Sequence, residues 1–138
     1  MTLKDALEAK RKRHHAHPEH DLQCKVSRYL DNHPKHPLWC ASAGGMRTSM
    51  GTAVKMKNSG YKKGFPDIFI YEIKCHENYF AVDIIDYYGL AIELKTESGH
   101  LSPEQKDWLE QLNNNGYKAV VCYGYQQAIK TIDEYLGA

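Results

Sequence analysis

Two stretches decide the fold of this chain: Gly64-Phe65-Pro66-Asp67-Ile68-Phe69-Ile70-Tyr71 and Leu90-Ala91-Ile92-Glu93-Leu94-Lys95. Each contains an apolar run with the length of a buried strand. Because successive side chains of a strand point to opposite faces, Glu93 and Lys95 lie on the same face, about 7 Å apart. Ile92 and Leu94 then face the other way, toward a core.

The polar residues of these stretches form a chemically coherent group. Asp67 directly precedes the first strand, and Glu93 and Lys95 lie on the second. If the strands are neighbours, the two carboxylates could hold a divalent cation beside an ammonium group. That arrangement suits attack on a phosphodiester bond, because it offers both an activated water molecule and positive charge.

Apolar periodicity outside these strands predicts an α/β fold. Pro18 opens a helix whose apolar residues Leu22, Val26 and Leu30 recur at helical spacing. The further predicted elements are a strand within 38–43, a helix from Ser102 to about 113, a strand at 117–123 and a helix at about 128–136. This order indicates a mixed central sheet flanked by helices (αβββαβ plus a terminal helix) in one domain, residues 18–138, after a tail at 1–17.

Residues 72–88, between the two halves of the proposed site, are predicted to form a strand, a turn and a returning strand. Their one basic and four acidic residues give a net charge of −3. Asp83 and Asp86 are not followed by a lysine two positions on. We therefore expect them to be exposed hairpin residues, outside the site.

Composition excludes several classes of protein. The 138 residues are 42% hydrophobic and carry a net charge of +1, which is typical of a soluble globular domain and gives no overall sign of nucleic-acid binding. No apolar stretch is long enough to cross a bilayer or to serve as a signal peptide. The four widely spaced cysteines indicate reduced thiols in mostly apolar surroundings, and hence a cytoplasmic protein.

Basic residues are concentrated in two places. Residues 1–17 contain five basic and two acidic residues, a net charge of +3, and are interpreted equally well as an arm along phosphates or as a solvated, partly helical tail. The second group has no acidic residue between positions 48 and 63 and leads directly to Asp67. Its position favours phosphate contact over a merely solvated loop or short helix; its members are Arg47, Lys55, Lys57, Lys62 and Lys63.

Two further polar residues have both a structural and a functional interpretation. Glu19 lies in the first turn of its helix, where the helix dipole favours an acid, but it is also beside the inward stripe. Gln105 lies three residues after Ser102 and can complete a capping box. It also shares a helix face with Trp108, so its amide could steady Lys95 or a water molecule.

These motifs, in this order, resemble the VRR-NUC family of the PD-(D/E)xK nuclease superfamily. The resemblance runs from about Glu19 to the end of the chain. It rests on Glu19 four residues before Gln23, Gly44-Gly45-x-Arg47, Gly64-x-Pro66-Asp67, Gly89-Leu90-x-Ile92-Glu93-x-Lys95, Leu101-Ser102-Pro103-x-Gln105 and Gly116-Tyr117-x-Ala119-Val120-Val121-Cys122. The long interval between Asp67 and Glu93 departs from the family pattern and leaves the substrate geometry open.

The resemblance implies a restriction-endonuclease-like core and a Mg²⁺-dependent, structure-specific DNA endonuclease, with Mn²⁺ able to substitute. Asp67, Glu93 and the backbone carbonyl of Leu94 would bind the cation, with Glu19 completing the acidic site. Lys95 would act on the nucleophile or the phosphate, supported by Gln105. Removal of Asp67, Glu93 or Lys95 is expected to lower turnover by orders of magnitude and to leave folding nearly intact, because these groups are not core packing.

Small standalone members of the family resemble dimeric Holliday-junction resolvases, which implies branched DNA as substrate, a homodimer, no membrane partner and a bacterial or phage-infected host cell. Three alternatives stay open: a flap or nicking nuclease, a non-catalytic module that binds branched DNA, and a zinc protein. The zinc alternative is weak, because the eight histidines and four cysteines lack ligand spacing.

Overall fold

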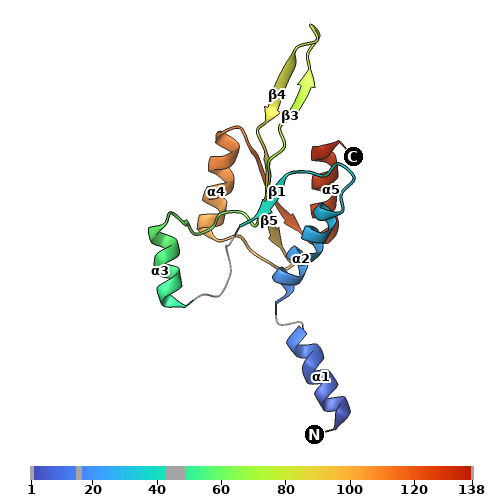
Figure 1. Ribbon diagram of the computed structural model, residues 1–138, viewed down its shortest axis with the longest axis vertical. Helices are drawn as coiled ribbons and strands as arrows, with labels where there is room; N and C mark the ends of the chain where they lie inside the picture. The colour runs from blue at the N-terminus through green and yellow to red at the C-terminus, as the bar shows by residue number, and fades with distance from the viewer. Residues whose placement is uncertain (1, 15–16, 43–48, 138) are drawn as a thin grey trace.

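The computed structural model describes residues 2–14, 17–42 and 49–137. Figure 1 shows the elements in order along the chain. They are α1 (Leu3–His14), α2 (Pro18–Asp31), β1 (Trp39–Ala41), α3 (Met50–Asn58), β2 (Ile68–Ile70), β3 (Lys74–Glu77), β4 (Asp83–Tyr87), β5 (Leu90–Lys95), α4 (Pro103–Asn114), β6 (Lys118–Tyr123) and α5 (Tyr125–Leu136). The motif Gly44-Gly45-x-Arg47 lies outside the described residues.

The central sheet has the order β1-β2-β5-β6. β1 and β2, and β2 and β5, run antiparallel, whereas β5 and β6 run parallel. β5 lies in the interior of the sheet, and all six of its residues are buried. The predicted α/β fold with a mixed central sheet flanked by helices is therefore confirmed.

Helices cover both faces of the sheet, as Figure 1 shows with α4 on one side and α2 with α5 on the other. One core cluster joins the sheet to α2 and α5 and includes Val26, Ile92, Leu94 and Ile132. The other face packs Phe69, Ala91 and Ala119 against α4. Alternation along β5 therefore sends Ile92 and Leu94 to the core of α2 and α5, as predicted, and puts Glu93 on the α4 face.

Local sequence signals set the ends of the helices. Pro18 is at the start of α2, and Ser102 caps α4 in a complete capping box. Gly116, with a φ of 86°, follows α4 where left-handed backbone is needed. The segment expected to be a loop or a short helix contains α3, whose cap is Ser49.

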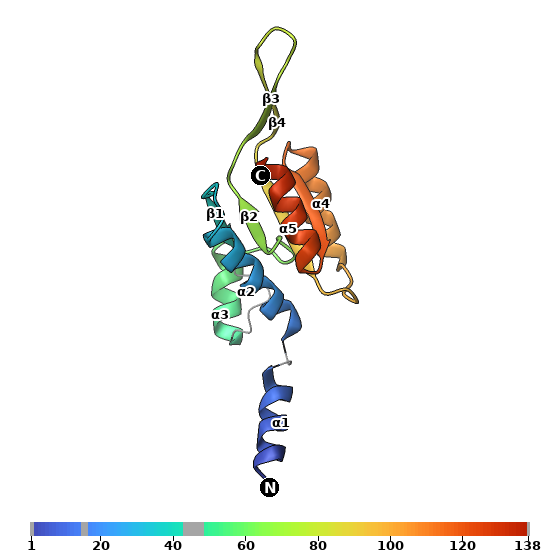
Figure 2. The same ribbon diagram turned by 90° about the vertical axis from the view of Figure 1, so that its right-hand side faces the viewer.

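Residues 72–88 form the predicted hairpin, a separate two-stranded sheet of β3 and β4. Its turn is held by Asn78, whose side-chain oxygen accepts the backbone N–H groups of Phe80 and Val82. Asp83 and Asp86 are exposed on it, as expected. Figure 2 shows the hairpin projecting from one end of the protein and α1 from the other.

Two other expectations concern cysteines and membranes. All four cysteines are free thiols, but Cys40 and Cys75 are exposed, so the expectation of apolar surroundings is wrong for these two. Both lie on short strands with exposed residues, where a thiol can face solvent. Among the helices that the structure describes, none is both long and apolar enough to cross a membrane.

The loop before Asp67 packs tightly against the start of α4. Gly64 has a φ of 91°, and a Cβ added to it would lie 2.7 Å from the backbone carbon of Glu104. We expect Gly64→Ala to lower the free energy of unfolding by about 2 kcal/mol or more, from backbone strain and this clash together. Urea unfolding measures the change.

Gly51→Ala is the matched control, because Gly51 lies in α3 with nothing within 4 Å of an added Cβ. Alanine is the better helix former, so this variant should be neutral or slightly more stable. Equal destabilisation by both substitutions would contradict the steric argument.

Candidate active site

The register of the sheet brings the two halves of the predicted site together. β2 and β5 run antiparallel with Ile68 opposite Ile92, so Asp67 lies level with Glu93 at the same end of the sheet. Asp67 Oδ2 accepts a hydrogen bond of 2.7 Å from the backbone N–H of Leu94. This bond fixes the Asp67 carboxylate beside β5 and was not foreseen from the sequence, because a backbone donor leaves no pattern in side chains.

Glu93 is buried, with 3% of its surface exposed, and its carboxylate has two partners. Gln105 Nε2 donates to Glu93 Oε1 over 2.8 Å. Lys95 Nζ lies 3.6 Å from the same oxygen. A buried carboxylate needs such donors, because its loss of hydration is otherwise uncompensated.

Lys95 is also buried, with 7% of its surface exposed. Its ammonium lies between Glu93 and Glu19, whose Oε1 is 3.5 Å away. Glu19 projects from the first turn of α2 and is about half exposed, so the site opens toward solvent on this side. The statement that Glu93 and Lys95 are not core packing is therefore wrong, because β5 runs through the middle of the sheet and buries both faces.

Gln105 completes the predicted capping box and also reaches the site, but with a partner other than the predicted one. Its Oε1 accepts the backbone N–H of Ser102 and its backbone N–H donates to Ser102 Oγ, which completes the capping box. Its remaining amide nitrogen donates to Glu93. Its partner is thus Glu93, where the sequence suggested Lys95 or a water molecule, and the first turn of α4 holds the site carboxylate directly.

Electrostatics favour a proton or a cation at the paired carboxylates. Burial, and after it the neighbouring Asp67 carboxylate, raises the pKa of Glu93 to about 8. Burial also raises the pKa of Asp67, against the opposing effects of the Leu94 hydrogen bond and the Lys95 charge. Two adjacent carboxyl oxygen donors that resist joint ionisation are a donor set that fits a hard dication such as Mg²⁺.

Glu19, the third acid of the predicted site, is separated from the Asp67 and Glu93 carboxylates. Glu19 meets the cluster through Lys95, and among the residues that the structure describes no three His, Cys, Asp or Glu side chains are grouped closely enough to form a ready cation site. The carbonyl of Leu94 as a further ligand stays a prediction. The residues that fit a cation are therefore Asp67 and Glu93.

The lysines of the predicted basic group are exposed near this end of the protein. Lys55 and Lys57 lie in the last turn of α3, and Lys63 Nζ is 3.6 Å from Glu104, the residue before Gln105. Trp108 Nε1 donates to the carbonyl of Lys63 and so ties this loop to α4. Lys62 is exposed beside it. Arg47 lies outside the described residues.

Comparisons with known proteins agree with this geometry. The profile of the VRR-NUC domain matches residues 4–126. The chain belongs to the VRR-NUC family. A solved structure described as a VRR_NUC domain protein is similar to it, with 27% identity and a TM-score of 0.68 over 86% of this chain and 88% of the other. Among proteins with curated functions, no significant match is found.

The match to this nuclease-related family begins at residue 4, so it includes most of α1.

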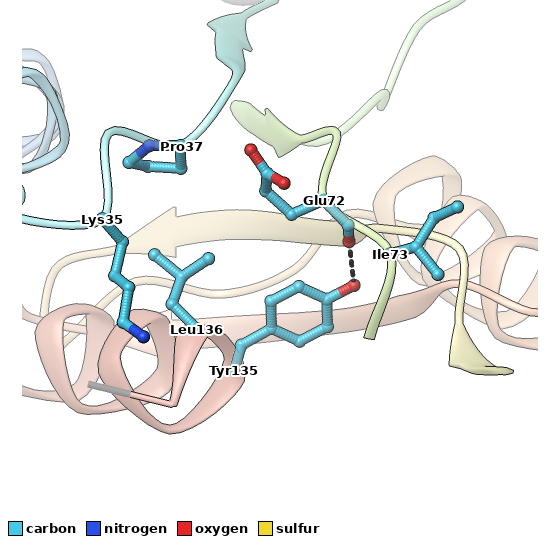
Figure 3. Close-up of a pocket in the computed structure, with 6 residues that line it drawn as sticks. All are labelled: Lys35, Pro37, Glu72, Ile73, Tyr135 and Leu136. Carbon is cyan, nitrogen blue, oxygen red and sulfur yellow. Dashed lines mark hydrogen bonds between the residues drawn. The ribbon is translucent and has the colours of Figure 1, made fainter. Parts of the chain in front are cut away.

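A cleft of about 180 Å³, shown in Figure 3, lies apart from the candidate active site. It is lined by Lys35, Pro37, Glu72, Ile73, Tyr135 and Leu136, none of which belongs to the carboxylate cluster.

The raised pKa of Glu93 has a consequence for stability in the metal-free protein. The folded state holds the Glu93 proton up to a pH of about 8, whereas the carboxyl has an ordinary pKa of 4.5. The folded state therefore binds more protons between these values, and stability falls as the pH rises from 4.5 to 8. We expect Glu93→Gln to be more stable than the unsubstituted protein at pH 8 in EDTA, by roughly 2–4 kcal/mol, and to gain little at pH 4.5.

Urea unfolding at the two pH values measures this difference. Glu104→Gln is the matched control, because Glu104 is an exposed acid beside the site whose pKa is lowered, mainly by hydrogen bonding at its own helix start. It should not be stabilised at pH 8. A pH-independent effect of Glu93→Gln would contradict the assigned titration.

Proposed function

We propose that this protein is a metal-dependent deoxyribonuclease that hydrolyses phosphodiester bonds in branched DNA such as Holliday junctions. The observation that carries the proposal is the cluster of half-buried Asp67 with buried Glu93 and Lys95 at one end of β2 and β5, in a chain of the VRR-NUC family. Two carboxylates beside an ammonium can hold a dication and stabilise negative charge on a phosphate.

Asp67 and Glu93 would hold Mg²⁺, with Mn²⁺ as a substitute and the Leu94 carbonyl as a further ligand. When bound, such a cation lowers the pKa of a water molecule and offsets negative charge on the scissile phosphate. The protein supplies the orientation. Gln105 fixes one oxygen of Glu93 and the Leu94 N–H fixes one oxygen of Asp67, which leaves each carboxylate a second oxygen.

Lys95 would stabilise negative charge at the phosphate or orient the attacking water. Glu19 and Glu93 hold its ammonium from two sides. Glu19 is exposed and would add negative charge at the mouth of the site, or hold a water molecule there.

DNA would be held by its backbone. Lys55, Lys57, Lys62 and Lys63 are exposed along α3 and the loop that leads to Asp67, with Arg47 as a further predicted contact. Lysines of this kind contact phosphates and carry no base information, so recognition would rest on DNA shape. Cutting a four-way junction on opposed strands requires two such sites, hence a homodimer.

A non-catalytic module that binds branched DNA is the second candidate. The burial of Glu93 next to Asp67 speaks against it, because burial raises the pKa of both carboxyls and the raised pKa of Glu93 lowers stability near neutral pH. Phosphate binding would gain nothing from buried acids, whereas a cation site needs them.

The proposal is tested by incubating labelled four-way junction, flap, duplex and single-stranded DNA with the protein in Mg²⁺ or in EDTA. We expect paired cuts in the junction in Mg²⁺ and none in EDTA. Asp67→Asn and Lys95→Met should each lower the rate by about a hundredfold or more, because each removes a group that acts on the reacting phosphate.

Methionine replaces Lys95 here because it fills a buried space that alanine would leave empty. Thermal unfolding of each variant separates loss of chemistry from loss of fold, and Lys130→Met, on the exposed surface of α5, is the matched control. Binding of junctions without any Mg²⁺-dependent cut would favour the non-catalytic module. Cutting of flaps alone would keep the chemistry and discard junction resolution.

The exposed lysines give a separate prediction for DNA affinity. Lys55→Gln combined with Lys57→Gln should weaken binding of every DNA sequence alike. It should also reduce the slope of log Kd against log salt by about 0.9 for each phosphate that the variant no longer neutralises. Fluorescence anisotropy over a salt series measures both effects. Lys130→Gln should leave the slope unchanged, and the same slope in all three proteins would remove α3 from the DNA-binding surface.

A further inference from the structure

The β3–β4 hairpin is not covered by any other element in the part of the chain that the structure describes. Figures 1 and 2 show it projecting beyond the helices and the central sheet. Its apolar side chains are exposed to an unusual degree, with Tyr79 at 97% and Phe80 at 79%. A two-stranded hairpin is marginally stable alone in water, and its free edges invite pairing.

The base of this hairpin is firmly attached. Lys74 Nζ donates to the last carbonyls of α5, at 2.9 Å for Glu134 and 3.0 Å for Tyr135. The Tyr135 hydroxyl donates to the carbonyl of Glu72, as Figure 3 shows. On the other side the N–H of Tyr88 donates to Gly116. The hairpin is therefore held out from the domain in a fixed direction.

One face of the hairpin combines apolar and acidic groups. Cys75 lies opposite Ile85, and Glu77 lies opposite Asp83 nearer the tip. Like charges directly opposite one another destabilise a strand pair, and neither of these two acids forms an ion pair with any part of the chain that the structure describes. A cationic partner would relieve this repulsion.

DNA does not fit this face. Its acids repel phosphates, and the hairpin leaves the sheet at the end opposite the carboxylate cluster. β2 runs from Asp67 toward the hairpin, and β5 runs back from it to Glu93. The partner must therefore be a basic surface with an apolar portion.

The helix α1 has this composition. Leu3 and Leu7, four residues apart and hence on one helix face, are 80% and 57% exposed. Four consecutive basic residues follow at 10–13. The distance between an apolar and a charged residue is also similar on the two surfaces. It is about 6 Å along the helix from Leu7 to Arg11 and about 7 Å along the strand from Cys75 to Glu77.

The helix cannot reach the hairpin of its own chain. α1 has 12 residues and joins the domain at Pro18, the start of the 14-residue α2, at the end of the protein away from the hairpin. Folded back along α2, it would span about 18 Å of a helix about 21 Å long and stop short of the hairpin. Figure 2 shows the two elements at opposite ends.

We propose that α1 docks on the β3–β4 hairpin of a second copy of this chain. Two copies side by side in opposite directions, related by a two-fold axis, make the contact twice, which closes the assembly. Leu3 and Leu7 cover Cys75 and Ile85, and the basic residues meet Glu77 and Asp83. The contact uses no residue of the proposed active site; it rests on the proposed function only in that it supplies the second site that symmetric junction cutting requires.

Charge exchange in the full-length protein tests this contact, with mass measured by sedimentation equilibrium. We expect the unsubstituted protein to have the mass of two chains. The double variant Glu77→Lys/Asp83→Lys should have the mass of one chain. Adding Lys10→Glu and Arg11→Glu, which lie on the same helix face as Leu3 and Leu7, to that variant should restore the dimer. Glu97→Lys with Glu110→Lys, two exposed acids elsewhere, should stay dimeric.

A cross-link tests the apolar half of the contact independently. In a protein carrying Cys40→Ser to remove the other exposed thiol, Leu7→Cys and the native Cys75 should give a covalent dimer with a short bismaleimide. Adding Cys75→Ser should abolish the cross-link.

A monomeric unsubstituted protein, a dimer that survives charge reversal on the hairpin, or a failure of the exchanged charges to restore it overturns the proposal. A charge reversal on α1 that lowers DNA affinity without changing the mass also overturns it and makes α1 a DNA arm. A monomer with Mg²⁺-dependent cleavage rejects the docking alone, and an inactive dimer rejects the nuclease proposal alone.

Discussion

The burial of ionisable side chains in the central strand is the constraint on which the rest of the structure depends. Glu93 and Lys95 occupy an interior strand whose every residue is buried. Groups of this kind are tolerated only when hydrogen bonds and opposite charges replace water. Here the replacements come from two separate helices, α4 through Gln105 and α2 through Glu19. Asp67, in the loop before β2, is fixed beside them by a backbone N–H of β5.

Because the buried Glu93 and Lys95 depend on these partners, the helix start and the loop around them are held in fixed positions. The capping box of α4 fixes the first turn of that helix and, through the same glutamine, the orientation of Glu93. Gly64 allows the loop before Asp67 to lie against that turn without a Cβ. Helix cap, loop conformation and carboxylate position are thus one connected unit, and the proposed chemistry rests on it.

Strand direction separates the two ends of the protein. β2 leads away from the carboxylate cluster, the hairpin turns the chain around, and β5 leads back. The acidic, apolar hairpin and the exposed lysines of α3 are consequently far apart along the sheet direction. The hairpin proposed to bind a second copy and the lysines proposed to bind DNA are therefore separate surfaces of opposite charge.

Much of this could be predicted from the sequence. Periodicity and capping signals predicted α2, α4 and the hairpin, because their determinants are local: Pro18, the Ser102–Gln105 pair and the turn after Glu77. The spacing of Glu93 and Lys95 placed both on one face for the same reason. What failed was the assumption that these polar groups lie outside the packed interior, since burial depends on whether a strand has neighbours on both sides.

By itself, then, the sequence determined the mixed α/β fold, the identity of the clustered acids and lysine, and the resemblance to the VRR-NUC family. Only the tertiary structure decided that Gln105 contacts Glu93, that Leu94 donates to Asp67, and that Glu19 reaches the cluster through Lys95. These contacts join residues from 12 to 76 positions apart in the chain. Local patterns set the secondary structure, whereas strand register and helix packing set which distant groups meet.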